Sequence, residues 1–243
     1  MDGRIARGQF AERLVQIKTE MLSQGKHVLR IVEATVEAAF DRDRERAHRV
    51  IEEDRQVDAN DIRIERECVN LLTDAAAATC EPGETHSLTP FQIRLILTIV
   101  KVNNEVERIA DLAVTIANQM DSIEAADEAL PGAFRMIANS VLGMLQETVA
   151  SFETLDSERA RAVLRSDDAT EEFREAILRA SERQLAAGSR TADFAFTLNR
   201  IAAALARMAD HCTNICEQVI YVDTGKIVRH DDSHWTDTED PDV

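Results

Sequence analysis

The sequence contains little of what a β-sheet protein needs. Among its 243 residues are only eight Gly and four Pro, and the aromatic residues are eight Phe, one Trp and one Tyr. Sheets need turn residues every few positions and favour aromatic and β-branched side chains. Ala, Leu, Ile, Arg and Glu dominate instead, and these residues favour helices. We therefore expect an all-α protein.

Long apolar runs are also missing. No run approaches the roughly 18–20 residues that a membrane span needs, and the first residues, MDGRIARGQF, lack the apolar stretch of a signal peptide. Four Cys are few for a disulfide scaffold of this size. These absences predict a cytoplasmic protein with reduced thiols, which would reach a membrane only through its partners.

Basic residues are outnumbered. The chain has 28 Lys and Arg against 45 Asp and Glu, a formal net charge of −17, and its only lysines are Lys18, Lys26, Lys101 and Lys226. Nucleic acids and anionic lipid surfaces favour partners with a net basic surface. We therefore expect neither nucleic-acid binding nor membrane insertion.

The rare helix-breaking residues divide the chain into six long helical segments. These predicted helices cover residues 9–40, 44–80, 90–121, 131–154, 157–186 and 190–223. Asp43 is placed to cap the second, and Thr89 followed by Pro90 is typical of a helix start. From Asp231 to Val243 the chain is acidic and nearly free of aliphatic residues, which predicts a disordered tail.

An internal repeat relates the two halves. The third predicted helix carries a heptad seam, typical of left-handed bundle packing, made of Leu95, Ile99, Val102, Val106, Ile109, Ala113, Ile116 and Met120. A shift of 99 residues gives a second seam without a gap, made of Phe194, Leu198, Ile201, Leu205, Met208, Cys212, Ile215 and Val219. We predict two tandem three-helix bundles, at residues 1–122 and 123–230, followed by the tail at 231–243.

Acidic pairs recur away from these seams. Residues four apart share one face of a helix, and such pairs occur at Asp54/Asp58 and Glu107/Asp111 in the first half. The second half offers Asp167/Glu171, with Asp168 beside them, and Asp210. Two acidic pairs across a groove form an oxygen-rich site for a divalent or trivalent cation such as Mg²⁺, Mn²⁺, iron or Zn²⁺. The alternative is that these acids only form solvated helix faces.

Two other patterns are weaker evidence for a metal site. Cys212 and Cys216 lie four apart, but on or beside the apolar seam, which favours buried structural thiols over a soft-metal site. Glu45 and His48 have the Glu-x-x-His spacing of di-iron bundles, yet that motif is needed twice and occurs once. We see no Gly-rich phosphate loop and no nucleophile elbow, and we expect no enzymatic activity.

Three segments carry recognisable motifs: VERIAD at 106–111, LARMADHCTNICE at 205–217 and TGKIVRH at 224–230. They resemble the PhoU family of bacterial phosphate-uptake regulators. The segment VERIAD at 106–111 is similar to the family's LERIGD signature, and LARMADHCTNICE at 205–217 is similar to its LERIGDHATNIAE. The segment TGKIVRH at 224–230 is similar to the closing TGE-x-VRH. The match covers nearly the whole chain, duplication included.

This resemblance implies two three-helix bundles whose E/D-x-x-x-D motifs bind metal clusters on the surface. Carried over by position, the motifs are Asp54/Asp58, Glu107/Asp111, Asp167/Glu171 and Asp210. One departure matters, because Ala206 stands where the second half should have a Glu. The second site, with Asp168 among its ligands, should therefore bind more weakly, and Asn214 and Glu217 are candidate additional ligands.

The resemblance also implies a role in signal transduction. It implies a homodimeric cytoplasmic adaptor that negatively regulates the phosphate-starvation (Pho) regulon and phosphate uptake. Such an adaptor couples the phosphate ABC transporter, through its ATPase PstB, to the sensor histidine kinase PhoR. Two alternatives stay open: an accessory protein of a low-affinity phosphate permease, and a carboxylate-bridged metal-storage or redox bundle.

Overall fold

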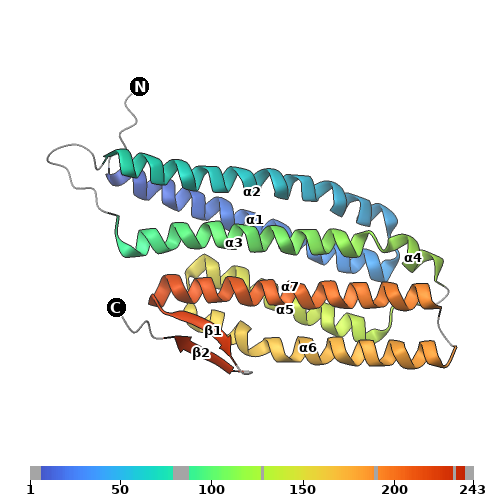
Figure 1. The fold of residues 1–243 in the computed structure, drawn as a ribbon. Coiled ribbons are helices and arrows are strands. Elements are labelled where there is room, and N and C mark those ends of the chain that lie inside the picture. The colour runs from blue at the N-terminus through green and yellow to red at the C-terminus, as the bar shows by residue number, and fades with distance from the viewer. Residues whose placement is uncertain (1–6, 79–87, 127–128, 189–190, 232–233, 239–243) are drawn as a thin grey trace.

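Seven helices and one β-hairpin make up the described part of the chain. The computed structural model describes residues 7–78, 88–126, 129–188, 191–231 and 234–238. The elements are α1 (Arg7–Asp41), α2 (Arg44–Ala78), α3 (Pro90–Ala117), α4 (Met120–Ala125), α5 (Gly132–Thr154), α6 (Ser157–Ala186), α7 (Ala192–Thr224), β1 (Ile227–Asp231) and β2 (His234–Thr238). The expected all-α class is confirmed, and six of the helices are long (Figure 1).

The helix starts follow from local capping. The side chain of Thr89 accepts a hydrogen bond from the backbone N–H of Gln92, whose own side chain reaches back in a capping box, and Pro90 is the first helical residue. Asp43 accepts from the N–H of Arg46 at 2.9 Å. These two caps were predicted from sequence, and both are confirmed.

The third predicted helix is shorter than expected. It was predicted to run from 90 to 121, but α3 ends at Ala117, and the short helix α4 begins at Met120. No Pro or Gly marks this break. The redirected chain buries Met120 and Ile123, so apolar packing, rather than a helix-breaking residue, explains where α3 ends.

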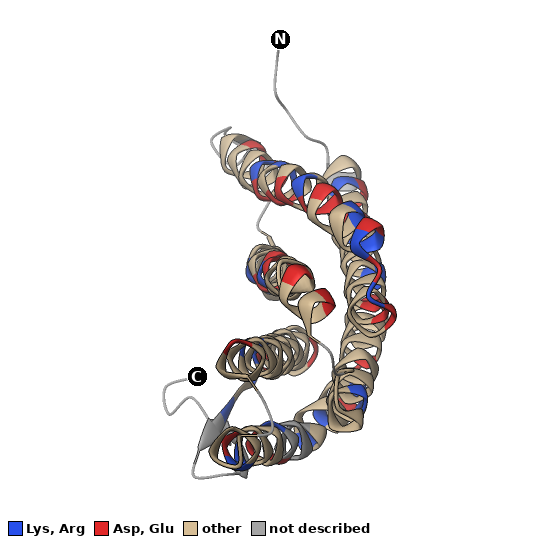
Figure 2. Cartoon of the chain, turned by 90° about the vertical axis from the view of Figure 1, so that its right-hand side faces the viewer, with Lys and Arg blue, Asp and Glu red and all other residues tan. Residues whose placement is uncertain are grey.

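The long helices run roughly parallel or antiparallel to one another. Helices α1–α3 form one three-helix unit and α5–α7 the other, and the units contact each other through the pairs α1–α5 and α3–α7. Figure 2 looks along the helices and shows them arranged in a curve. The tandem-bundle architecture is confirmed, and α3 and α7, which carry the two heptad seams, lie side by side at the junction of the halves.

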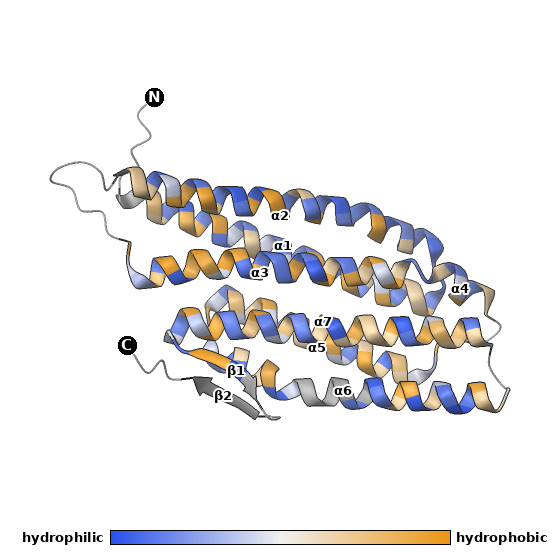
Figure 3. Cartoon of the chain, in the orientation of Figure 1, coloured by the Kyte–Doolittle hydropathy of each residue, from blue (hydrophilic) through white to orange (hydrophobic). Residues whose placement is uncertain are grey.

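The predicted seams form the core. All sixteen residues of the two predicted seams are buried, with Met120 on α4 and the others on α3 and α7, and so are Val50, Val57, Ile64, Cys68 and Leu71 of α2. Figure 3 shows the resulting pattern, with apolar stripes along helices whose other faces are hydrophilic. Cys212 and Cys216 are both fully buried, as predicted from their places on and beside the seam.

A β-hairpin follows α7 and differs from the prediction. Gly225 ends α7 in the left-handed conformation, with φ +75°, and β1 then pairs antiparallel with β2. The predicted disordered tail is therefore wrong for residues 234–238. Aliphatic residues are scarce there, but Trp235, Thr236 and Thr238 favour strands, and β1 anchors the hairpin by burying Val228. Residues 232–233 and 239–243 lie outside the described part.

No helix in the described residues is both long and apolar enough to cross a membrane. The long helices instead combine one apolar face with polar faces, as expected for helices packed in a bundle.

Candidate functional site

The acidic residues predicted in the first half lie on two neighbouring helices. Asp54 and Asp58 lie on α2, and Glu107 and Asp111 lie on the neighbouring α3. Burial, together with the negative charges of Asp58 and Asp111, raises the pKa of Asp54 to about 6. The influence of Asp111 shows that the acidic pairs of the two helices face the same region. We call these four residues the acidic face.

Glu107 experiences the same repulsion. Burial raises the pKa of its carboxyl group, as does the charge of Asp111, while the Arg108 guanidinium lowers it. Arg108 lies 3.5 Å from Glu107 (Nε to Oε2) and 3.6 Å from Asp111 (Nη1 to Oδ2). One cation thus offsets part of the negative charge, and the pKa of Asp54 and Glu107 remains raised. Such a face is electrostatically suited to a bound cation.

The donor set fits a hard cation, because carboxylate oxygens are the ligands that Mg²⁺, Mn²⁺ and iron prefer. In the described residues, however, no three Asp, Glu, His or Cys side chains converge to hold an ion. These carboxylates are at least partly exposed on helix surfaces. Coordination would therefore require them to change rotamer toward a common point.

The second half is different. Asp210 is exposed on α7, and Ala206, one turn earlier, supplies no carboxylate. Asp167, Asp168 and Glu171 belong to α6, but their side chains lie outside the described residues. The structure thus brings together the first-half residues of the predicted set and leaves the second-half cluster untested.

The two additional candidate ligands bond to other protein groups. Asn214 donates from Nδ2 to Glu105 Oε2 at 3.0 Å, and Glu217 accepts from the Arg229 guanidinium. Glu105 also lies 2.6 Å from His211 Nδ1. These residues form a polar junction between α3, α7 and β1. Sequence reasoning missed it, because Glu105 lies more than 100 residues from His211 and Asn214 and shares no motif with them.

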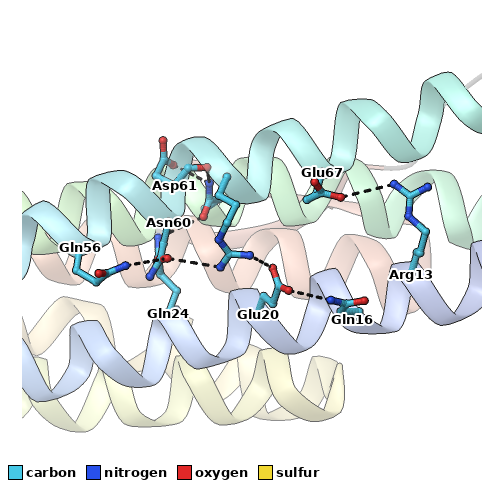
Figure 4. A network of polar contacts seen from close by, with 10 residues as sticks. Arg13, Gln16, Glu20, Gln24, Gln56, Asn60, Asp61 and Glu67 are labelled. Carbon is cyan, nitrogen blue, oxygen red and sulfur yellow. Dashed lines mark hydrogen bonds and ion pairs between the residues drawn. The ribbon is translucent and has the colours of Figure 1, made fainter.

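A second feature lies beneath the acidic face. Asp61, whose place in the α2 seam should be apolar, accepts a 2.6 Å hydrogen bond from Nδ2 of Asn103 on α3. Gln24 of α1 lies against both helices, donating to the Val57 carbonyl at 3.3 Å, and both amide residues are buried (Figure 4). The break in the apolar pattern at Asp61 was the available sequence signal. It marks a buried polar contact among all three helices of the first half.

Surface contacts extend this network between α1 and α2. Arg63 pairs with Glu20 and reaches Asn60, and Gln16 donates to Glu20 at 3.2 Å (Figure 4). Nearer the start of α1, Arg13 pairs with Asp74 at 2.6 Å. These contacts fix how α1 and α2 lie against each other along their length.

The Glu-x-x-His pair does not form a buried centre. Glu45 and His48 are both exposed on α2. A di-iron bundle needs its carboxylates and histidines to project into the bundle interior. This placement argues against the metal-storage or redox alternative at these residues.

The architecture and the acidic face define a class: an all-α protein built from two tandem three-helix bundles. A family model described as "PhoU domain" matches residues 21–120 and again residues 134–219. The chain belongs to the PhoU family. The two matches fall on the two helical units, as the internal repeat predicted.

Named relatives and solved structures support this family assignment. The phosphate-specific transport system accessory protein PhoU of Serratia marcescens is 29% identical over 224 residues, which is 92% of this chain and 88% of the relative. The protein of the same name from Escherichia coli (strain K12) is 27% identical over the same shares. The crystal structure of PhoU from Pseudomonas aeruginosa has a TM-score of 0.81 at 26% identity, covering 89% of this chain and 100% of that one. The structure from Streptococcus pneumoniae, at 20% identity and a TM-score of 0.80, has the same fold and covers 91% and 100% of the two chains.

Proposed function

We propose that this chain is a non-enzymatic accessory protein of a phosphate-specific transport system. The observation that carries the proposal is the double match to the PhoU domain, together with relatives of that name aligned over most of both chains. The similarity spans both bundles. It therefore favours a role that needs the whole molecule over a role that depends on one short segment.

We further propose the regulatory role that the family resemblance implies. The chain would work in the cytoplasm, couple the ATPase PstB of the phosphate ABC transporter to the sensor kinase PhoR, and act as a negative regulator of the Pho regulon. Long helices with exposed faces suit such an adaptor, because partner helices can lie along them. Ile62 and Val69, one heptad apart on α2, are 56% and 55% exposed and offer apolar contacts for a partner or a second copy.

The third part of the proposal is cation binding on the acidic face. The raised pKa of Asp54 and of Glu107 reflects burial and mutual repulsion, and a divalent or trivalent cation would relieve that repulsion. The ion would order α2 against α3 and thereby shape the surface offered to partners. The first half is the stronger candidate, since Ala206 leaves the second half one carboxylate short.

Deletion of the gene tests the regulatory proposal. In abundant phosphate, we expect the deletion strain to express alkaline phosphatase constitutively, and the full chain supplied in trans should restore repression. Unchanged repression in the deletion strain would contradict the kinase-coupled role. It would favour the accessory protein of a low-affinity permease.

A further inference from the structure

Helix α2 has an outer face that points away from the rest of the bundle. The helix packs against α1 and α3 and, near its start, against α4. It lies at the upper edge of the molecule in Figure 1 and at one end of the curve in Figure 2. Along the second half of this face, exposed residues follow one another at alternating spacings of three and four: Ala59, Ile62, Arg66, Val69, Thr73 and Ala76. This is the heptad spacing of a helix-packing seam, and we call these six residues the outer seam.

The equivalent helix of the second half lacks such a seam. A shift of 113 residues aligns buried positions of α2 with buried positions of α6: Ala47 with Ala160, Val50 with Val163, and Ile64 with Ile177. The same shift places Glu175 at the position of Ile62 and Glu182 at the position of Val69, and both acids are exposed. The outer face of α6 is thus a solvated one. In α2, the same two positions instead expose more than half of an apolar side chain.

The outer seam also carries charges that the chain does not pair. Arg66 lies on the seam and Glu65 beside it, and both are exposed without an ion-pair partner among the described residues. The neighbouring Arg63, which is turned toward α1, is in contrast paired with Glu20. An adjacent Glu and Arg between two apolar side chains can be matched by the same four residues on a second helix that runs in the opposite direction.

We propose that the outer seam binds the outer seam of a second copy of this chain, with the two α2 helices antiparallel. The two-fold axis passes between Glu65 and Arg66. In such an isologous interface each contact occurs twice. Ile62 packs on Val69 of the second copy, and Arg66 meets Glu65 of the second copy. The proposal does not depend on the transport role, and it gives the homodimer implied by the family resemblance a specific face and register.

Charge favours self-association at this face. Each copy carries a net charge of −17, so two copies repel each other over much of their surface. From residue 55 to residue 76, however, the outer face of α2 has Arg55, Arg63 and Arg66 against Asp58 and Glu65. Its local charge is therefore close to balanced. Two copies can meet here with little repulsion, and the two contacts between Arg66 and Glu65 add attraction.

Sedimentation equilibrium of the full chain tests the proposed face. We expect a dimer that forms between about 1 and 100 micromolar protein. Ile62→Glu and Val69→Glu give α2 the residues that α6 has at these positions, and each should raise the dissociation constant at least about 10-fold, because each removes apolar contacts twice per dimer.

The matched control is Met136→Glu on α5, whose side chain is 55% exposed, as is that of Val69. It should leave the dissociation constant unchanged, and circular dichroism should show the same helix content in all variants. A monomeric mass over the whole concentration range would overturn the proposal. So would a dimer that Ile62→Glu and Val69→Glu affect no more than the control does.

A charge exchange tests the register. Arg66→Glu alone sets acid against acid, and Glu65→Arg alone sets base against base, so each should raise the dissociation constant about 5- to 10-fold. The double variant restores both contacts with their signs exchanged, and its dissociation constant should lie within about 3-fold of the wild type. Losses that add up in the double variant, or single variants that bind like the wild type, would contradict the antiparallel register.

Discussion

His211 of α7 places its Nδ1 2.6 Å from Oε2 of Glu105 on α3, and this contact joins the two halves of the molecule. Both side chains are largely buried, with 23% and 25% of their surfaces exposed. Asn214 donates to the same carboxylate oxygen. The polar junction therefore ties together the two helices that carry the repeated seams.

This contact predicts a pH dependence of stability. Burial alone raises the pKa of Glu105, but hydrogen bonds from His211 and Asn214 and the nearby positive charge outweigh it and hold the pKa below its usual value. The folded pKa is depressed, so the stabilisation is present above the ordinary carboxyl pKa and is lost as pH falls through the lower folded value.

Glu105→Gln should therefore lower the free energy of unfolding near neutral pH by about 1–2 kcal/mol, with a smaller difference in acid. Urea unfolding followed by circular dichroism between neutral and acidic pH measures it. Glu147→Gln, an exposed acid on α5 that pairs with Arg159 at the surface, is the control. A difference that grows in acid would contradict the prediction.

Asp54 should change the pH dependence of stability in the opposite direction to Glu105. Its pKa is raised to about 6, so its ionisation costs stability as pH rises from the ordinary value of 3.8 through 6. In the presence of a chelator, Asp54→Asn should be more stable than the wild type by about 1 kcal/mol at neutral pH, a figure discounted for solvent screening. Thermal denaturation across this range is the measurement. Equal stability of both proteins at all pH values would show that the repulsion is negligible.

Cation binding should be asymmetric between the halves. Glu107→Ala removes a carboxylate from the acidic face and should weaken the tightest site for Mn²⁺ about 10-fold or more, because charged oxygen ligands dominate affinity. Asp210→Ala should change it little. Titration with Mn²⁺ of both variants, with Glu52→Ala as an exposed acid of α2, distinguishes the halves. If Asp210→Ala abolishes the tight site while Glu107→Ala leaves it intact, the second half binds the cation more tightly than the first, contrary to this prediction. If no variant changes the metal content, these acids only form solvated helix faces.

Asn103 should be needed for the stability of the first half. Its side chain is buried and donates to both the carboxylate and the carbonyl of Asp61, at 2.6 and 2.9 Å. Asn103→Ala removes both bonds and leaves partly buried oxygens of Asp61 unpaired, which should cost about 1–3 kcal/mol. A urea midpoint unchanged from the wild type would contradict this. Asn104→Ala, an exposed neighbour on α3, serves as the control.

Much of this fold follows from residue periodicity. The seams from Leu95 to Met120 and from Phe194 to Val219 are buried as their spacing predicted, because apolar burial dominates helix packing. Caps such as Thr89 act within three residues, so they could also be predicted. The four-residue spacing indicated the acidic pairs and the family resemblance matched them to its motifs, and in the structure the pairs of the first half lie close enough to influence one another's pKa.

Other features depend on contacts that no local pattern encodes. The pairs Glu105–His211 and Glu217–Arg229 form only after α3 and α7 have packed and the hairpin has folded back. The hairpin itself depends on burial of Val228 against the bundle.

Phosphate uptake in a deletion strain tests the central proposal most directly. In abundant phosphate, loss of this protein should raise the rate of radiolabelled phosphate uptake, and the increase should disappear when the ATPase of the phosphate ABC transporter is also deleted. The full chain supplied in trans should restore the low rate. An uptake rate unchanged by the deletion, or an increase that persists without the ATPase, would contradict the account.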